Sequence, residues 1–345
     1  MSLLETAAHP RGANRGDAQA RHEDFAAAPH SWYYLGHVSE VSPRPVRFEL
    51  PNGQAFVAFR TASGRFGVLA ARCCHMGTDL ARGCVIGERL ACPLHGWEFG
   101  PDGQCARIPI QEQIPAFARQ TSYPVEERRG HLFFYNQPEA RFPLPFFDGV
   151  RPEELYPARA FTLEVQAPWY FVAANGFDVQ HFLHAHDRRV VGEPTVECTQ
   201  DGARRIHVRL QITGNSFTER LTRWFAGPEF SLTVTAWSGA MTFVQAAFKR
   251  TTTYGWATIQ PLPANRTRLK IIVWARRSRT PAGRLWLDPT SAWIRSFFIR
   301  RFLASDIERI VDVRYDPRRL LPADLHFARH LDWLRSMQDS LTLRP

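Results

Sequence analysis

The sequence lacks long hydrophobic runs and almost lacks lysine. No stretch of its 345 residues approaches the roughly 18 uninterrupted apolar residues that a membrane-spanning helix needs, so we expect no such helix. The first residues also lack the compact apolar segment of a secretory signal peptide. Lys249 and Lys270 are the only lysines among 43 basic residues, so the formal charge of +10 rests on arginine. The arginines are scattered, with no basic stripe between stacking aromatics, and we expect no nucleic-acid partner.

Cysteine is scarce and forms no disulfide framework. Six irregularly spaced cysteines in a chain of this length are typical of a reducing compartment, so we expect a cytoplasmic protein. With 44% hydrophobic residues the chain is long enough for two cores. We expect a disordered or loosely attached arm at 1–30, a first domain at 31–145 and a second at 146–345. A Pro- and Phe-rich linker at 141–155 marks the boundary between the domains.

Two pairs of Cys and His lie close together in the first domain. The first pair is Cys73-x-His75 and the second is Cys92-x-x-His95, with 16 residues between His75 and Cys92. Each pair offers a thiolate and an imidazole at short range, which suits a [2Fe–2S] cluster held by two Cys and two His. A glycine follows each pair, where the backbone must approach the inorganic core.

The spacing C-x-H-x16-C-x-x-H resembles the Rieske iron–sulfur motif, and the following GWEFGPDGQCARIP resembles the strand and turn after the second Rieske loop. The resemblance implies that these four residues hold the cluster. Zinc is the alternative, although zinc sites usually show C-x2-C or H-x3-H spacing. Thr78 and Leu94 stand where Rieske proteins of respiratory complexes carry a disulfide. The cluster therefore resembles the lower-potential type of ring-hydroxylating oxygenases and their ferredoxins.

The pattern of short and long β-prone segments predicts an α+β fold. Pro51-Asn52-Gly53 between two β-prone runs predicts a hairpin within an N-terminal all-β domain. Beyond the linker, long β-prone runs precede a segment with helical spacing, and Asp288 before Pro289 predicts the start of that helix. We expect an antiparallel sheet wrapped on a long helix. With the family resemblance, this implies a Rieske [2Fe–2S] domain followed by a helix-grip (START-like) catalytic domain.

A second cluster of candidate ligands contains Asp178, His181, His184 and His186 within a short segment. Two His and one carboxylate form a facial triad that leaves positions open on Fe(II). On a regular helix His181 and His184 would lie about 60° apart, whereas His181 and His186 would lie about 140° apart. Regular geometry therefore favours His184, and the pair His181 and His186 requires a helix that is distorted or ends there.

The spacing N-x-x-D-x-x-H-x4-H resembles the motif of Rieske non-haem iron oxygenases, which implies that His181 and His186 are the iron ligands. The C-terminal segment resembles that of steroid-type oxygenases, which implies that Asp306 is the third ligand. Glu308 and Asp312 are the other candidate carboxylates on the late helix. The alternative for Asp306 is an ion pair with a nearby arginine on a solvated helix face.

Two further residues gain expected roles from the resemblance. Asp178, three residues before His181 and one helical turn back, would bridge His181 to His95, or less favourably His75, of a neighbouring subunit. The alternative is a helix-capping or surface aspartate. Asn175 would be the amide beside the iron, the alternative being an ordinary cap or turn residue.

The resemblance implies an oxygenase that uses O2 and takes electrons from NAD(P)H through a separate reductase or ferredoxin. The chain itself has no GxGxxG nucleotide fingerprint after a strand. A cluster supplied by a neighbour implies a homotrimer. We expect monooxygenation of a bulky hydrophobic or aromatic small molecule, with cis-dihydroxylation of an arene second. A Rieske electron-transfer protein and a catalytically silent binding module are the other possibilities. Candidates for an apolar pocket are Phe182, Leu183, Trp237, Phe243, Trp293, Phe297 and Phe298.

Overall fold

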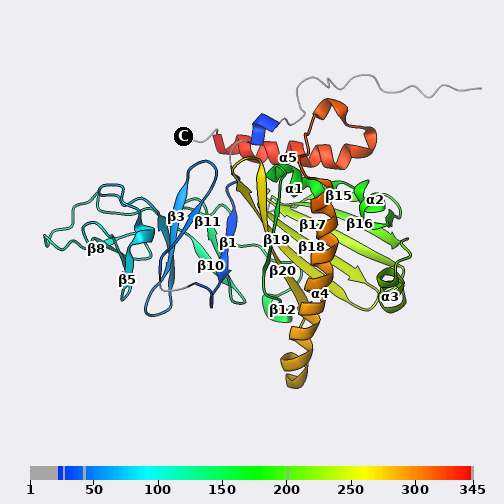
Figure 1. Cartoon of the computed structure of the whole chain (residues 1–345), viewed down its shortest axis with the longest axis horizontal. Helices are drawn as coiled ribbons and strands as arrows, with labels where there is room; N and C mark the ends of the chain where they lie inside the picture. The colour runs from blue at the N-terminus through cyan, green and yellow to red at the C-terminus, as the bar shows by residue number, and fades with distance from the viewer. Residues whose placement is uncertain (1–21, 26–27, 42–43, 200–201, 343–345) are drawn as a thin grey trace, which may run out of the picture.

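The computed structural model describes residues 22–25, 28–41, 44–199 and 202–342. Figure 1 shows two parts side by side, with short strands in blue and cyan beside a large sheet that a long orange helix crosses. Most of the arm predicted at 1–30 lies outside the described residues. Phe25 within it is buried and stacks on Tyr170 at 4.3 Å between ring centroids, so this part of the arm is packed.

The first part consists of three small antiparallel sheets. Their strand orders are β1-β11-β10, β2-β3-β4-β9 and β5-β6-β7-β8. The strands are β1 (Trp32–His37), β2 (Val46–Glu49), β3 (Ala55–Arg60), β4 (Phe66–Ala70), β5 (Cys84–Ile86), β6 (Arg89–Ala91), β7 (Glu98–Phe99), β8 (Cys105–Arg107), β9 (Ser122–Tyr123), β10 (Val125–Arg128) and β11 (His131–Tyr135). The hairpin predicted around Asn52 is confirmed, because β2 pairs with β3 across it.

The second part is a nine-stranded antiparallel sheet with the central order β12-β20-β19-β18-β17-β16-β14, to which β13 adds beside β20 and β15 beside β16. Its strands are β12 (Leu155–Pro157), β13 (Phe161–Val165), β14 (Arg188–Val190), β15 (Thr195–Cys198), β16 (Arg204–Ile212), β17 (Glu229–Trp237), β18 (Met241–Phe248), β19 (Thr252–Leu262) and β20 (Arg266–Arg276). The predicted α+β class with an antiparallel sheet and a long helix is confirmed.

The helices gather on one face and one edge of this sheet (Figure 1). They are α1 (Trp169–Ala174), α2 (His181–His186), α3 (Phe217–Ala226), α4 (Pro281–Arg309) and α5 (Leu325–Thr342), with 3₁₀ turns at His22–Phe25, Leu80–Arg82, Pro152–Glu154, Asn175–Phe177, Pro317–Arg319 and Pro322–Asp324. The predicted start of the long helix at Asp288 was wrong. Helix α4 begins at Pro281 after the Thr280 cap, and Asp288 lies inside it, where its carboxylate accepts a hydrogen bond from the Ser278 backbone N–H at 2.8 Å.

The two faces of the large sheet have different partners. Side chains alternate between faces along each strand. On one face Trp256 and Trp274 join a buried aromatic cluster with the first part of the chain, and Phe133 stacks on Trp256 at 4.3 Å. On the other face Ala257 and Ile259 line a cavity beneath α4. The first part of the chain and the cavity therefore lie on opposite sides of one sheet.

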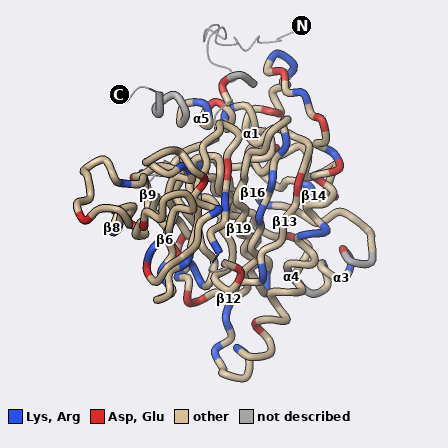
Figure 2. The backbone as a smooth tube through the Cα atoms, turned by 60° about the vertical axis from the view of Figure 1, so that its left-hand side comes forward, with Lys and Arg blue, Asp and Glu red and all other residues tan. Residues whose placement is uncertain are grey.

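Charged residues are distributed over both parts, and Figure 2 shows blue and red segments interspersed along the chain. Within the described residues, none of the helices has both the length and the apolar character needed to cross a bilayer.

Candidate metal centres and cavity

Two similar loops present the first set of candidate ligands. Strand β4 leads to Cys73, whose backbone N–H donates to Thr78 O at 2.9 Å while Gly77 N–H donates back to Cys73 O at 2.9 Å. Strand β6 leads to Cys92, whose backbone N–H donates to Trp97 O at 2.8 Å and whose carbonyl oxygen accepts from Gly96 N–H at 3.0 Å. Both glycines have positive φ, +72° and +66°, which L side chains rarely adopt. Each loop therefore folds tightly around its cysteine.

The four side chains divide between the interior and the surface. The Cys73 and Cys92 thiols are buried and free, whereas His75 and His95 are exposed with ring centroids 4.8 Å apart. Trp97 stacks on His75 at 4.4 Å and 6°. Burial raises the pKa of the Cys73 thiol. Two inner thiols facing two outer imidazoles fit a [2Fe–2S] cluster with one all-sulfur iron and one solvent-facing iron.

Gln120 holds the first of these loops and was missed by the sequence analysis. Its side chain is buried, and its amide donates to Ala70 O at 2.7 Å and Arg72 O at 2.6 Å. Its carbonyl oxygen accepts from the Cys74 backbone N–H at 2.9 Å. One side chain thus satisfies three backbone groups beside the Cys73 ligand position. No spacing in the sequence connects Gln120 to a loop about 46 positions away.

The second candidate centre joins α2 to α4. His181, His186 and Asp306 each offer a ligand atom, and these atoms lie within 4.8 Å of one another. His186 Nε2 is 2.8 Å from Asp306 Oδ1, yet this buried nitrogen has no hydrogen-bond partner among the described residues. Burial lowers the pKa of His181, which favours the neutral imidazole that binds metals. Two ligand atoms that approach each other without a hydrogen bond fit a cation placed between them.

The end of α2 explains the four-residue gap between the two histidines. The helix stops at His186 because Asp187 adopts the left-handed conformation with φ +51°. His186 therefore lies on the last turn, where its ring stacks on Phe302 at 3.6 Å, while His184 is exposed. Regular helix geometry, which favours His184, does not apply here. Glu308 and Asp312, the other candidate carboxylates, are also exposed.

Asn175 and Asp178 lie beside this centre. The Asn175 amide donates to Asp306 Oδ2 at 3.3 Å, so it orients the carboxylate. Asp178 was predicted one helical turn before His181, which was wrong, because its backbone is extended between two helical segments. Its Oδ1 accepts from the Gln180 backbone N–H at 3.0 Å, and its backbone carbonyl contacts His181 Nδ1. This contact leaves Nε2 of His181 for a metal.

A cavity of about 930 Å³ begins at this centre and extends between α4 and the sheet. Its walls are mostly apolar, and Asp306 and His181 lie in its lining. Phe182 and Phe298 line it as predicted. The prediction was wrong for Trp237 and Phe243, which belong to the aromatic cluster on the opposite sheet face. The remaining candidates, which are exposed and do not line the cavity, are Leu183, Trp293 and Phe297.

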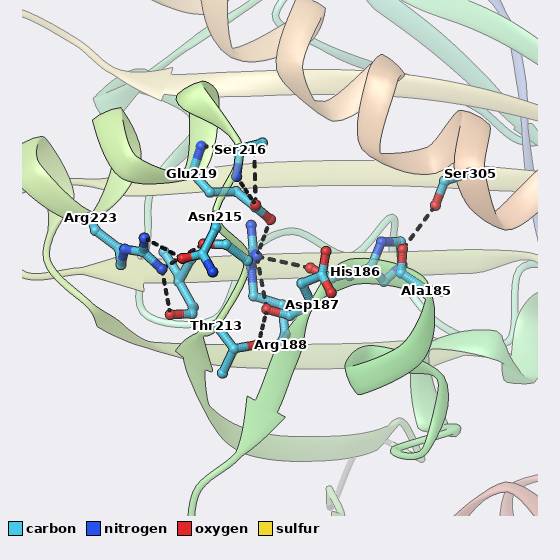
Figure 3. Close-up of polar contacts among 12 residues, drawn as sticks. Ala185, His186, Asp187, Arg188, Thr213, Asn215, Ser216, Glu219, Arg223 and Ser305 are labelled. Atoms are coloured by element: carbon cyan, nitrogen blue, oxygen red, sulfur yellow. Dashed lines mark hydrogen bonds and ion pairs between the residues drawn. The ribbon is translucent and has the colours of Figure 1, made fainter.

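Helix α3 borders the cavity and is tied to α2 by polar contacts (Figure 3). Ser216 and Glu219 form a capping box at its start. Arg188 donates to Glu219 Oε1 at 2.9 Å and to the backbone carbonyl of His186 at 2.8 Å. Arg188 therefore connects a candidate metal ligand to the helix at the cavity wall. The sequence carried a signal for α3, since Ser followed three residues later by Glu is a helix-start pattern.

Comparisons with known proteins relate the first part of the chain to Rieske domains. Residues 31–118 match the Rieske [2Fe-2S] domain family. Cholesterol 7-desaturase from Ciona intestinalis is 33% identical over 165 residues, which are 46% of this chain and 34% of that protein. The oxygenase component of 3-ketosteroid-9-alpha-monooxygenase from Rhodococcus rhodochrous is 29% identical over 186 residues, which are 51% of this chain and 48% of that protein. The chain thus spans about a third to a half of the length of these curated relatives.

Solved structures share the fold over nearly the whole chain. Dicamba monooxygenase bound to dicamba superposes with a TM-score of 0.68 at 16% identity, covering 92% of this chain and 99% of that one. A mutant of NdmA from Pseudomonas putida with theobromine gives a TM-score of 0.68 at 18% identity, covering 91% of both chains. These similarities establish a common architecture for the small strands, the large sheet and the helices.

Proposed function

We propose that the chain is the oxygenase component of an O2-dependent enzyme system, because residues 31–118 match the Rieske [2Fe-2S] domain family and the chain shares its fold with dicamba monooxygenase. Its substrate would be a bulky hydrophobic small molecule. The observation that carries the proposal is the set of the partly buried His181 and the buried His186 and Asp306, which lies at one end of a large apolar cavity. Two imidazoles and one carboxylate leave coordination positions open toward that cavity.

The chain's own residues would hold, orient and shield the reacting groups. When bound, a ferrous ion at His181, His186 and Asp306 would supply O2 activation, and the [2Fe–2S] cluster would supply electrons. Asn175 would fix the Asp306 carboxylate through its amide hydrogen bond. The apolar cavity walls would exclude water and hold a C–H bond of the substrate beside the ligand set.

The position of the two centres supports transfer between subunits. In Figure 1 the cluster loops near β5 and β8 lie at one end of the molecule and α2 at the other, with the large sheet between them. We therefore propose a homotrimer in which each cluster serves the neighbour's iron, since a closed ring satisfies every subunit. The Asp178 carboxylate is 30% exposed and close to His181, and would contact His95 or His75 of the neighbouring subunit.

A separate reductase or ferredoxin would supply the electrons from NAD(P)H. The name of the Rhodococcus relative, an oxygenase component, supports this division of labour. The surplus of arginine offers an acidic donor favourable charge, although we attribute it first to composition. The six cysteines form no disulfide with one another, which suits a reducing compartment, and we propose a cytoplasmic location.

A Rieske electron-transfer protein is the second candidate, and it leaves the cavity and the second ligand set without a role. Among oxygenase reactions we rank monooxygenation first and cis-dihydroxylation of an arene second. The names of the relatives, a steroid monooxygenase and a cholesterol desaturase, favour a steroid-like skeleton and keep desaturation open.

Iron content tests the proposal. The oxygenase should bind about three iron ions per chain, two in the cluster and one at the mononuclear site, whereas an electron carrier binds about two. His186→Ala should lose one iron and all product formation, while His184→Ala, a matched change at an exposed position, should keep both. Iron is measured by metal analysis and the cluster by its visible absorption. Retention of the third iron in His186→Ala would refute the assignment of this ligand.

A further inference from the structure

One face of α4 forms a wall of the cavity along most of its length, and it carries an arginine away from the metal centre. Arg295 lines the cavity together with Thr251, Thr253 and Ser291. Its guanidinium donates to Ser291 Oγ at 3.2 Å, to Thr251 Oγ1 at 2.6 Å and to Thr253 Oγ1. These hydroxyls hold the guanidinium in place without neutralising its charge.

Arg295 has no acidic partner within the described residues. The cavity's four charged lining residues are Arg188, Glu219, Arg295 and Asp306. Arg188 is paired with Glu219 at 2.9 Å, whereas none of the described ion pairs includes Arg295. Burial lowers its pKa, and the group that opposes this effect is Tyr254, not a carboxylate. A partly buried cation without a counter-ion is costly unless something else supplies the negative charge.

The hydroxyl contacts do not use all the N–H donors of the Arg295 guanidinium. A guanidinium has about five N–H donors, and the hydroxyl contacts use one on each of its three nitrogens. The other two donors suit an oxygen ligand, and a carboxylate satisfies them best because it accepts in a planar, bidentate manner.

Along α4, Arg295 and Asp306 are eleven positions apart, which corresponds to about 16 Å of helix. The cavity wall between them is apolar and includes Ile299, Phe302 and Leu303. A molecule that contacts both ends must therefore be elongated, with a polar group at one end and an apolar body.

We infer that Arg295 is a specificity-determining residue that binds the carboxylate of an elongated hydrophobic acid, whose opposite end lies beside His181, His186 and Asp306. The inference rests on the proposed function only in taking the cavity as the substrate site. The substrate class is thus narrowed from hydrophobic molecules in general to carboxylic acids with a rigid or extended apolar skeleton.

Binding of matched acids and esters tests the inference. The purified holoprotein is titrated without O2, by calorimetry, with dehydroabietate and methyl dehydroabietate, and with dodecanoate and methyl dodecanoate. At least one acid should bind about tenfold or more tightly than its ester, since only the acid forms a charge-assisted pair. Equal affinity of acids and esters, or no saturable binding of either acid, would overturn the inference.

Three variants test whether Arg295 causes the tighter binding of acids than of esters. Arg295→Gln should weaken acid binding about tenfold and leave ester binding unchanged, which also shows that the cavity is intact. Arg295→Lys should weaken acid binding less than Arg295→Gln does, because lysine keeps the positive charge but lacks the planar pair of donors. Arg300→Gln is the control on the same helix, since Arg300 lies over the Phe161 ring and does not line the cavity. An acid preference that survives both Arg295 variants contradicts the inference.

This experiment fails or succeeds independently of the proposed function. It requires neither turnover nor the mononuclear iron, so its failure leaves the iron count unaffected. Conversely, a chain that binds only the cluster iron can still show the acid preference.

Discussion

At the scale of single residues, Gln120 offers a sharp test of how the first ligand loop is held. Gln120→Leu keeps the approximate volume and removes three hydrogen bonds to buried backbone groups beside Cys73. We expect the free energy of unfolding to fall by about 2–4 kcal/mol, because unsatisfied buried groups cost about 1–3 kcal/mol each and partly relax. Chemical denaturation and the rate of loss of cluster absorption measure the effect.

Gln104→Leu is the matched control for that prediction. Gln104 is exposed, and its side chain makes none of the described hydrogen bonds. The control should leave both stability and cluster lifetime nearly unchanged. If Gln120→Leu behaved like this control, the hydrogen bonds of Gln120 would not be what holds the loop.

Single residues also differ in how far the sequence predicts them. The spacing of Cys73, His75, Cys92 and His95 predicts the cluster ligands directly, because each pair lies within one short loop. The joining of His186 to Asp306 is not visible in this way, since it depends on how α2 ends and how α4 packs. Family resemblance suggested this pair, and the site assignment stays a prediction until metal is measured.

At the scale of elements, α3 is a short helix whose stability depends on its first turn. Glu219→Ala removes the capping box and the ion pair with Arg188, in which both side chains are mostly buried. Loss of a cap costs about 1 kcal/mol, and the ion pair adds to it, so local opening of α3 should become about tenfold more frequent. Hydrogen–deuterium exchange over 216–226 measures this, with β16 as the internal reference.

Glu229→Ala serves as the control, because Glu229 follows α3 closely, is exposed and makes none of the described side-chain contacts. Ligands bound in the cavity should dissociate faster from Glu219→Ala than from Glu229→Ala, since Leu221 and Trp224 on α3 line the cavity. Equal exchange in the two variants would show that the capping box does not hold α3.

Elements were predicted best where periodicity alone decides. The strands of the large sheet alternate in burial, as β16 does from Arg204 to Ile212, and their segments were recognised. The start of α4 was placed too late, because a proline often begins a helix. Here Pro289 lies inside α4. Asp288 does not cap the helix start; its carboxylate accepts a hydrogen bond from Ser278, which precedes the helix. That contact joins positions ten apart, and a linear pattern does not reveal it.

At the scale of the whole molecule, the large sheet separates the two centres. Its aromatic face packs against the small strands, and its other face lines the cavity. The sequence predicted both parts but not this arrangement, because β19 and β20 are buried on both faces over part of their length and their sequences do not say which face meets which partner. An electron path within one chain would have to lead from one side of this sheet to the other.

Mixed assemblies test whether the two centres cooperate between chains. His75→Ala should remove the cluster and Asp306→Ala the mononuclear iron, so each variant alone should be inactive. When the two are co-expressed in equal amounts, a site works where an intact triad adjoins a neighbour with an intact cluster motif. In randomly assembled trimers this occurs for about a quarter of the sites, so about a quarter of wild-type product formation should return.

The matched control pairs two cluster variants, His75→Ala and His95→Ala. Neither chain can then supply a cluster, so no activity should return however the subunits combine. Transfer within one chain predicts no recovery in either mixture, since no single chain of the first mixture has both centres intact. Recovery confined to the mixture with Asp306→Ala is therefore specific to transfer between subunits, and adding Asp178→Asn to both chains should reduce it without changing iron content.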